Sequence, residues 1–217
     1  MRVDMHMHTR VSFDCLCHPD AVLAAARSRG IDRICVTDHN RIEAAVELNE
    51  RHPDAVIVGE EVKTAEGIDV IGLFVSEVIP KGTPALETCL RIHEQRGIVY
   101  VPHPFVGGKG AGFILDIIGD HVDAIEAFNA RAHLKRFNDA AVEWGRAHDV
   151  PLGAGSDAHT LAEVGRAYVE TPPFEMNPAS FLAALRAGTV HGRFSSWAVH
   201  GASTWAKIHK RMRLGRR

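Results

Sequence analysis

The stretch of sequence that decides the fold is RVDMHMH, at residues 2–8. Apolar and polar side chains alternate along it, which predicts a short β-strand that ends on two histidines. His6 and His8 are two residues apart, so both imidazoles project from the same face of such a strand. An alanine-rich helix is predicted over 19–29, with Gly30 ending it, and a second strand over 31–37. This order is the first β-α-β unit of a parallel sheet.

The alternation of strands and helices continues along the chain. Further strands are predicted at 55–62 and 68–75, which pair most simply as a hairpin, and at 98–102, 122–128, 151–154, 167–170 and 190–194. Further helices are predicted at 41–51, 84–95, 112–119, 133–147 and 178–187. Repeated β-α units predict an α/β fold with a mainly parallel sheet, either closed into a barrel or open and doubly wound.

Histidine is over-represented in the composition. The 217 residues include 14 histidines but only 2 tyrosines, and histidine is a common metal ligand and a general acid or base near neutral pH. With 46% hydrophobic and 24% charged residues the chain is of the globular class, and four cysteines are too few for a disulfide framework at this length. The N-terminal residues carry no apolar signal segment, and no apolar run is long enough to span a bilayer, so we expect a cytoplasmic protein.

Charge is distributed unevenly. Residues 201–217 carry +6 and no acidic group, so residues 1–200 carry −8. We therefore expect one domain over 1–200 followed by a basic C-terminal tail over 201–217. A solvated terminus is the simplest interpretation of the tail, with anionic lipid, nucleic acid or a partner chain as alternatives. Trp205, Ile208 and Met212 follow helical spacing, which predicts an amphipathic helix that packs Trp205 and Ile208 against the domain and exposes its charges.

Polar clusters follow the predicted strands at the point where each strand ends. They contain His6 and His8, then Asp38 and His39, Glu60 and Glu61, His103, Glu126 and Asn129, and Asp157 and His159. The carboxyl ends of the strands are the functional face of a parallel barrel. Mixed imidazole and carboxylate ligands suit Zn, Mn or Fe, and about eight candidate ligands exceed what one tetrahedral ion needs. The sequence therefore predicts two or three divalent transition-metal ions lying close together.

The clusters resemble those of a known family, the PHP (polymerase and histidinol phosphatase) family of metal-dependent phosphoesterases. The resemblance covers roughly residues 2–195 and rests on HMH at 6–8, SFD at 12–14, TDHN at 37–40, GEE at 59–61, Pro-His-Pro at 102–104 and SDAH at 156–159. It implies a distorted (β/α)7 TIM-like barrel and a di- or trinuclear centre of Zn, Mn or Fe. The metal ligands it implies are His6, His8, Asp14, His39, Glu61, His103, Asp157 and His159. It places Glu61 rather than Glu60 at the bridging position. Strand alternation agrees, because it turns the two carboxylates to opposite sides, and Glu60 is expected to face solvent.

Several residues keep two interpretations. Glu126 and His133 compete for one additional ligand position. Cys15 and Cys17 form a Cys-x-Cys pair that is either a soft ligand pair or, more simply, a reduced loop. Two cations are candidates for binding substrate phosphate: Arg131, whose guanidinium can bind phosphate in two places, and Lys109, in a glycine-rich segment that is not a phosphate-binding Walker loop because glycine follows the lysine.

These residues predict hydrolysis of a phosphate ester by metal-activated water, with Asp157 or His159 protonating the leaving oxygen. The expected substrate is a small phosphorylated metabolite or nucleotide. The alternatives are a phosphodiesterase or exonuclease acting on short oligonucleotides, a non-catalytic metal-binding module, and an amidohydrolase-type C–N hydrolase. The acidic body disfavours long duplex DNA, which needs a basic channel.

Overall fold

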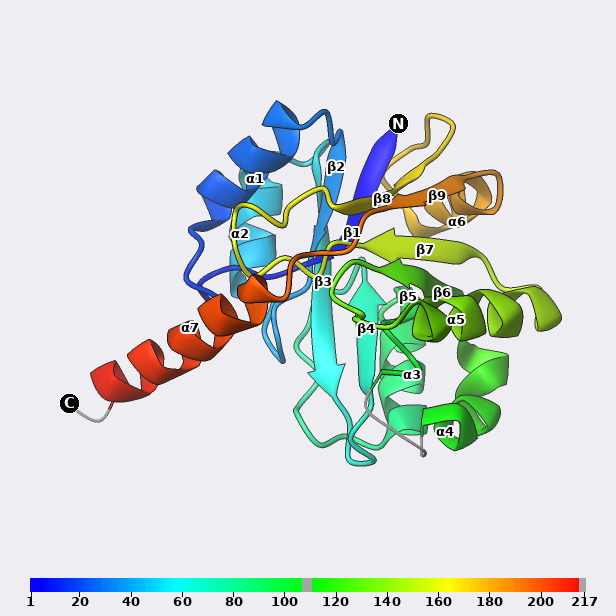
Figure 1. The fold of residues 1–217 in the computed structure, drawn as a ribbon. Coiled ribbons are helices and arrows are strands. Elements are labelled where there is room, and N and C mark those ends of the chain that lie inside the picture. Colours follow the sequence, from blue (N-terminus) through cyan, green and yellow to red (C-terminus); the bar gives the residue numbers. More distant parts are fainter. Residues whose placement is uncertain (107–110, 215–217) are drawn as a thin grey trace.

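The computed structural model describes residues 1–106 and 111–214, and these ranges hold one nine-stranded sheet (Figure 1). The strands, in chain order, are β1 (Arg2–Met7), β2 (Arg33–Val36), β3 (Val56–Lys63), β4 (Asp69–Leu73), β5 (Ile98–Val101), β6 (Ala124–Asn129), β7 (Leu152–Gly155), β8 (Ala167–Glu170) and β9 (Thr189–Gly192). They lie in the order β7-β6-β5-β4-β3-β2-β1-β8-β9. Strands β1, β2 and β3 pair in parallel, as do β5, β6 and β7, whereas β4 is antiparallel to both of its neighbours.

The sheet nearly closes on itself between β1 and the segment that follows β7. A parallel bridge joins Met7 to Ala158, the Asp157 amide donates to the His6 carbonyl at 2.8 Å, and the His8 amide donates to the Ala158 carbonyl at 2.9 Å. Nearer its start, β1 pairs instead with antiparallel β8. The molecule is therefore a distorted barrel of strands β1–β7 with the β8–β9 hairpin appended, which confirms the predicted fold class.

The helices cover the outside of the barrel. They are α1 (Pro19–Ser28), α2 (Glu43–Arg51), α3 (Ala85–Glu94), α4 (Ala111–Ile118), α5 (Lys135–Ala147), α6 (Pro178–Arg186) and α7 (Ala198–Leu214), with a short 3-10 turn, η1 (Gly119–His121). Figure 1 shows α1 and α2 on one side of the barrel and α3, α4 and α5 on the other. Gly30, at φ +72°, ends the α1 turn in the left-handed region, as the sequence predicts. No helix within the described ranges has the length and apolar content that a bilayer crossing needs.

The core is divided between the barrel interior and the layers beneath the helices. One cluster takes residues from all seven barrel strands, including Met5 and Tyr100, and is closed by Phe181 of α6. Met7 instead packs with Val22 of α1, although strand alternation would give Met5 and Met7 the same face. The irregular pairing of β1 with β2 between Asp4 and Met7 accounts for this change of face.

Helix α7 contradicts one expectation from the sequence. Trp205 and Ile208 are 58% and 46% exposed, so they do not pack against the domain. The opposite side of the helix faces inward, with Ser203 and Ala206 buried and Lys210 donating hydrogen bonds from its Nζ to backbone carbonyls of the loop after β1. The loop presents carbonyl oxygens rather than an apolar surface, so it binds the polar side of the helix.

Candidate metal centre

The eight ligands expected from the family resemblance lie together at the mouth of the barrel, where the parallel strands end. His6 and His8 come from the end of β1, Asp14 from the loop after it, His39 from the loop after β2, Glu61 from β3, His103 from the loop after β5, and Asp157 and His159 from the segment after β7. Each contacts at least one other member of the set. Segments separated by about 150 residues in sequence therefore contribute to a single site.

Glu61 occupies the middle of the cluster. Its Oε2 lies 3.3 Å from His6 Nε2, 3.3 Å from His8 Nε2 and 3.1 Å from His39 Nδ1. Its Oε1 lies 3.1 Å from His103 Nε2. One buried carboxylate thus faces four imidazoles, an arrangement suited to a ligand shared between ions. Glu60 points away from the cluster, as strand alternation requires, but it is buried rather than solvent-exposed, and its Oε2 accepts a hydrogen bond from the Ile79 amide at 2.8 Å.

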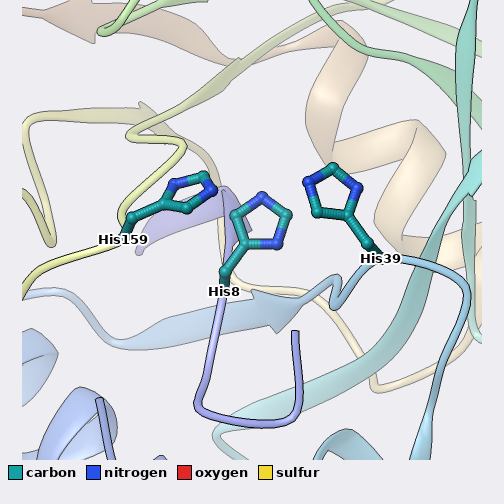
Figure 2. Close-up of side chains that lie close together, drawn as sticks. All are labelled: His8, His39 and His159. Atoms are coloured by element: carbon teal, nitrogen blue, oxygen red, sulfur yellow. The ribbon is translucent and has the colours of Figure 1, made fainter. Parts of the chain in front are cut away.

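Three imidazoles lie side by side on the other part of the cluster (Figure 2). The His8 ring lies between the other two, with its centroid 4.2 Å from that of His159 and 4.6 Å from that of His39. Asp14 Oδ2 lies 3.5 Å from His39 Nε2 and 3.2 Å from His159 Nε2. His8 Nδ1 is buried without a hydrogen-bond partner among the described residues. A buried imidazole nitrogen next to two other imidazoles is well suited to a metal ion.

The electrostatics of the cluster couple its carboxylates to its imidazoles. Burial, together with the neighbouring imidazoles, lowers the pKa of His8 to about 3, so this ring is neutral. Burial alone would raise the pKa of the Glu61 carboxyl, but the imidazoles of His39 and His6 hold it well below its usual range. Burial alone would lower the pKa of His39, but the nearby carboxylates of Glu61 and Asp14 raise this pKa to about 9. Without metal, the negative charge of the ionised carboxylates is partly balanced by protonated imidazoles. Metal ions would displace these protons and take over their role in balancing the charge.

Within residues 1–106 and 111–214, four groups of side chains place their ligand atoms within 4.8 Å of one another. They are His8–His39–His159, His6–His8–Glu61, His6–His103–Asp157 and His39–Glu61–Asp69. Since the groups share His6, His8, His39 and Glu61, the donor set fits more than one ion, with some ligands common to neighbouring ions. The imidazole content of the set suits transition metals better than Ca or Mg.

Asp69 is a member of these groups that the sequence analysis did not identify. It begins β4 and lies opposite Lys63 in the β3–β4 ladder, with its Oδ2 3.0 Å from Lys63 Nζ. The ligands expected from the sequence follow the carboxyl ends of parallel strands. Strand β4 is antiparallel, so it is its first residue that lies at the mouth of the barrel. The predicted β-hairpin could have identified Asp69, because pairing of its two strands brings Asp69 opposite Lys63 at the end of β3.

Glu126 supports the cluster from outside the four groups. Its Oε1 lies 3.2 Å from His6 Nδ1, and its Oε2 accepts hydrogen bonds from the His103 amide at 2.8 Å and from Asn129 Nδ2 at 2.9 Å. An Nδ1–H that donates to Glu126 leaves His6 Nε2 directed at the centre, as a buried carboxylate does for many metal-bound histidines. Gly155 makes this approach possible, since a Cβ there would lie 2.3 Å from His6 Cβ and 2.4 Å from Glu126 Oε1.

Replacing Glu126 with glutamine is expected to weaken metal binding by about 10–100-fold. Three N–H groups, from His6, His103 and Asn129, donate to this carboxylate, and an amide offers only one oxygen as acceptor. Competition with a chromophoric chelator measures the affinity directly. Glu60, which is also buried but accepts a hydrogen bond from the Ile79 amide rather than from a group of the cluster, supplies the comparison as Glu60→Gln. An equal loss in both variants would contradict this role for Glu126.

The other expected side chains have mixed positions. His133 precedes α5 rather than beginning it, stacks on Trp197 at 3.9 Å, and, within the described part of the chain, belongs to none of the four groups. The thiols of Cys15 and Cys17 lie 3.3 and 3.6 Å from the carbonyl oxygen of His159, as in a reduced loop. Lys109 lies outside the described residues.

A pocket of about 280 Å³ opens directly above the cluster. Its floor is formed by Asp69 and by the expected ligands other than His6 and His8, and its wall by Arg131, His133, Ser203 and Lys207, among others. Arg131 is nearly buried, its Nε 3.5 Å from Glu163 Oε1 and its Nη2 donating to Ser203 Oγ at 3.0 Å. A cluster able to hold cations therefore lies at the base of an open pocket with cationic side chains on its wall.

Comparison with known proteins matches this geometry to one family. The model of the PHP domain matches residues 4–141, and a second family model, described as PHP-associated, matches residues 135–190. The chain belongs to the PHP family. The family predicted from the strand-end motifs is therefore confirmed, and the PHP domain match begins at Asp4, within β1.

Among similar proteins, an uncharacterized protein of Methanocaldococcus jannaschii is 32% identical over 203 residues, which cover 87% of this chain and 81% of the relative. Two crystal structures share the fold at lower identity. A two-domain protein from Bacteroides vulgatus, described as containing a predicted PHP-like metal-dependent phosphoesterase, has a TM-score of 0.71 at 19% identity; the match covers 89% of this chain and 65% of that one. A lesion-specific endonuclease from Pyrococcus furiosus has a TM-score of 0.62 at 16% identity, over 88% of this chain and 58% of the endonuclease.

Proposed function

We propose that this PHP protein is a metal-dependent phosphoesterase that hydrolyses a small phosphorylated metabolite or nucleotide. The observation that carries the proposal is the set of imidazoles and carboxylates at the base of a pocket of about 280 Å³, a volume suited to a small ligand. The pocket is open, whereas a purely structural metal site is closed by protein ligands. When bound, two or three ions of Zn, Mn or Fe would supply a water nucleophile at neutral pH and neutralise charge on the phosphoryl oxygens.

The side chains have distinct tasks in this proposal. The ions would be held by the eight expected ligands, His6, His8, Asp14, His39, Glu61, His103, Asp157 and His159. His159 Nδ1 donates to the Asp157 carbonyl at 2.9 Å, which orients its Nε2 toward Asp14. Burial alone would raise the pKa of the Asp157 carboxyl, but the imidazoles of His6 and His8 hold it well below its usual range. Of the two expected proton donors, His159 is therefore the better candidate to protonate the leaving oxygen. Arg131 on the wall would bind phosphate oxygens.

A phosphodiesterase acting on short oligonucleotides is the second candidate. The endonuclease of Pyrococcus furiosus supports it only as a protein of the same fold. The −8 charge of residues 1–200 disfavours long duplex DNA, but an open pocket admits the end of a short single strand. Monoester and diester chemistry place similar demands on a metal cluster, so the substrate screen must include both.

Metal analysis followed by a substrate screen tests the proposal. We expect two or more transition-metal ions per chain in the purified, metal-loaded protein, measured by elemental analysis. We also expect release of phosphate from a panel of phosphorylated metabolites and nucleotides, with slower cleavage of bis(4-nitrophenyl) phosphate. A protein that retains one ion, or that binds its ions yet cleaves no phosphate ester, would refute the proposal.

A further inference from the structure

Helix α7 places a lysine over the cluster. Lys207 Nζ lies 3.7 Å from Asp14 Oδ2, and it lies 5.2 Å from the centroid of the Phe13 ring. The side chain lines the same pocket as Arg131, and it is only partly buried. At 3.7 Å the ion pair with Asp14 is longer than a hydrogen bond, so the ammonium has donors available for another anion.

Contacts on both sides of Lys207 fix the helix at the pocket. One turn earlier, the buried Ser203 Oγ accepts the hydrogen bond from Arg131 Nη2. One turn later, Lys210 Nζ donates to the carbonyl of Arg10, at 2.6 Å, and to that of Ser12. Ser203, Lys207 and Lys210 share one side of the helix, since they are spaced by four and three residues. Figure 1 shows the C-terminal part of α7 extending away from the body.

The charge of the pocket suits the Lys207 ammonium to binding an anionic ligand. When Asp14 binds an ion, its carboxylate would attract the Lys207 ammonium less strongly. The ammonium and the Arg131 guanidinium then form the cationic part of the wall, above a base whose charge the ions have neutralised. A phosphomonoester carries up to two negative charges on its terminal phosphate, whereas a phosphodiester carries one. Two cations beside the ions therefore favour the monoester.

We propose that α7 is part of the active site and that Lys207 binds the terminal phosphate of a phosphomonoester substrate. The proposal rests on the phosphoesterase function and narrows its substrate class. It also assigns a role to part of the basic segment, for which the sequence predicted only an amphipathic helix docked on the domain. The remaining cations of α7 need not contribute: Arg211, one turn after Lys207, is exposed and is not among the residues that line the pocket.

The test compares Lys207→Met with Arg211→Met, which removes the same charge from the same helix. Inorganic phosphate is the probe, titrated calorimetrically into metal-loaded protein, and elemental analysis gives the metal content of each variant. We expect phosphate affinity to fall about 10-fold in Lys207→Met and to change little in Arg211→Met, with metal content unchanged in both. Lys207→Arg, which keeps the charge, should recover most of the affinity. With 4-nitrophenyl phosphate, Lys207→Met should raise KM more than it lowers kcat, and it should affect bis(4-nitrophenyl) phosphate less.

Three results would overturn this role of Lys207. The first is an unchanged phosphate affinity of Lys207→Met at full metal content. The second is loss of metal from Lys207→Met, which would make the lysine a support of the metal site. The third is an equal loss of phosphate affinity in Lys207→Met and Arg211→Met, which would indicate a long-range effect of charge. Failure of the phosphoesterase function is separate. A wild-type protein that binds metal and phosphate but cleaves no ester refutes that function, while the phosphate titrations still decide the role of Lys207.

Discussion

Replacing Glu61 with glutamine is expected to lower kcat/KM for phosphate-ester hydrolysis by more than about 100-fold, since loss of a supporting partner behind a ligand alone costs about 10–100-fold. The carboxylate faces four imidazoles, so its loss removes a ligand available to several ions at once. An amide retains the shape of the side chain but loses its negative charge. Steady-state kinetics with 4-nitrophenyl phosphate, together with elemental analysis, measure the effect.

Glu60→Gln is the matched control, one residue away on the same strand. Burial raises the pKa of Glu60 to about 7, so the carboxyl is partly protonated near neutral pH and a neutral amide is a close substitute. The amide oxygen can still accept the hydrogen bond from the Ile79 amide. Activity near that of the wild type is therefore expected. Equal losses in the two variants would show that the wrong glutamate has been assigned to the metal centre.

Removing the metal is expected to lower the melting temperature by about 8–16 °C. Ions held at 1,000 times their dissociation constant stabilise the folded state by about 4 kcal/mol, and each kcal/mol shifts the melting temperature of a chain of this size by about 2–4 °C. Calorimetry before and after dialysis against a chelator gives the difference. Restoring Zn or Mn should restore the higher melting temperature.

A pair of histidine variants separates specific from non-specific effects of the chelator. His8→Ala removes an imidazole from the centre of the cluster and should lose most of the metal-dependent shift. His148→Ala removes an exposed imidazole that stacks on Trp144, outside the cluster, and should keep the whole shift even if its own stability differs. The same chelator-induced shift in both variants would mean that the stabilising ions bind elsewhere.

The sequence predicted the position of the cluster because one geometric rule governs it. Parallel strands present their carboxyl ends on the same face, so His8, His39 and Asp157 could be brought together without knowledge of the loops. The choice of Glu61 over Glu60 combined the family's motif with strand alternation. Alternation does not tell whether the other side of β3 faces solvent. The expectation that Glu60 faces solvent was wrong, because the segment that contains Ile79 covers it.

Two other features needed the tertiary structure. Asp69 reaches the cluster from the start of an antiparallel strand, so the rule for parallel strands missed it. The pattern of α7 showed a helix with an apolar and a basic side, but a periodic pattern does not specify which side binds the protein. Trp205 was expected to face inward because apolar burial usually dominates. The surface beside α7 instead offers backbone carbonyls and Asp14, which Lys210 and Lys207 approach.

The near-closure of the barrel has a consequence for the time at which the site can form during synthesis. The cluster spans the edge at which β1 meets the segment after β7, and the group of His6, His103 and Asp157 has members on both sides of that edge. A nascent chain that has not yet emerged as far as residue 157 lacks Asp157 and His159, so the groups His6–His103–Asp157 and His8–His39–His159 are still incomplete. The complete site can therefore form only after the first and last strands of the barrel have met, and full metal loading then reports on completion of the whole ring.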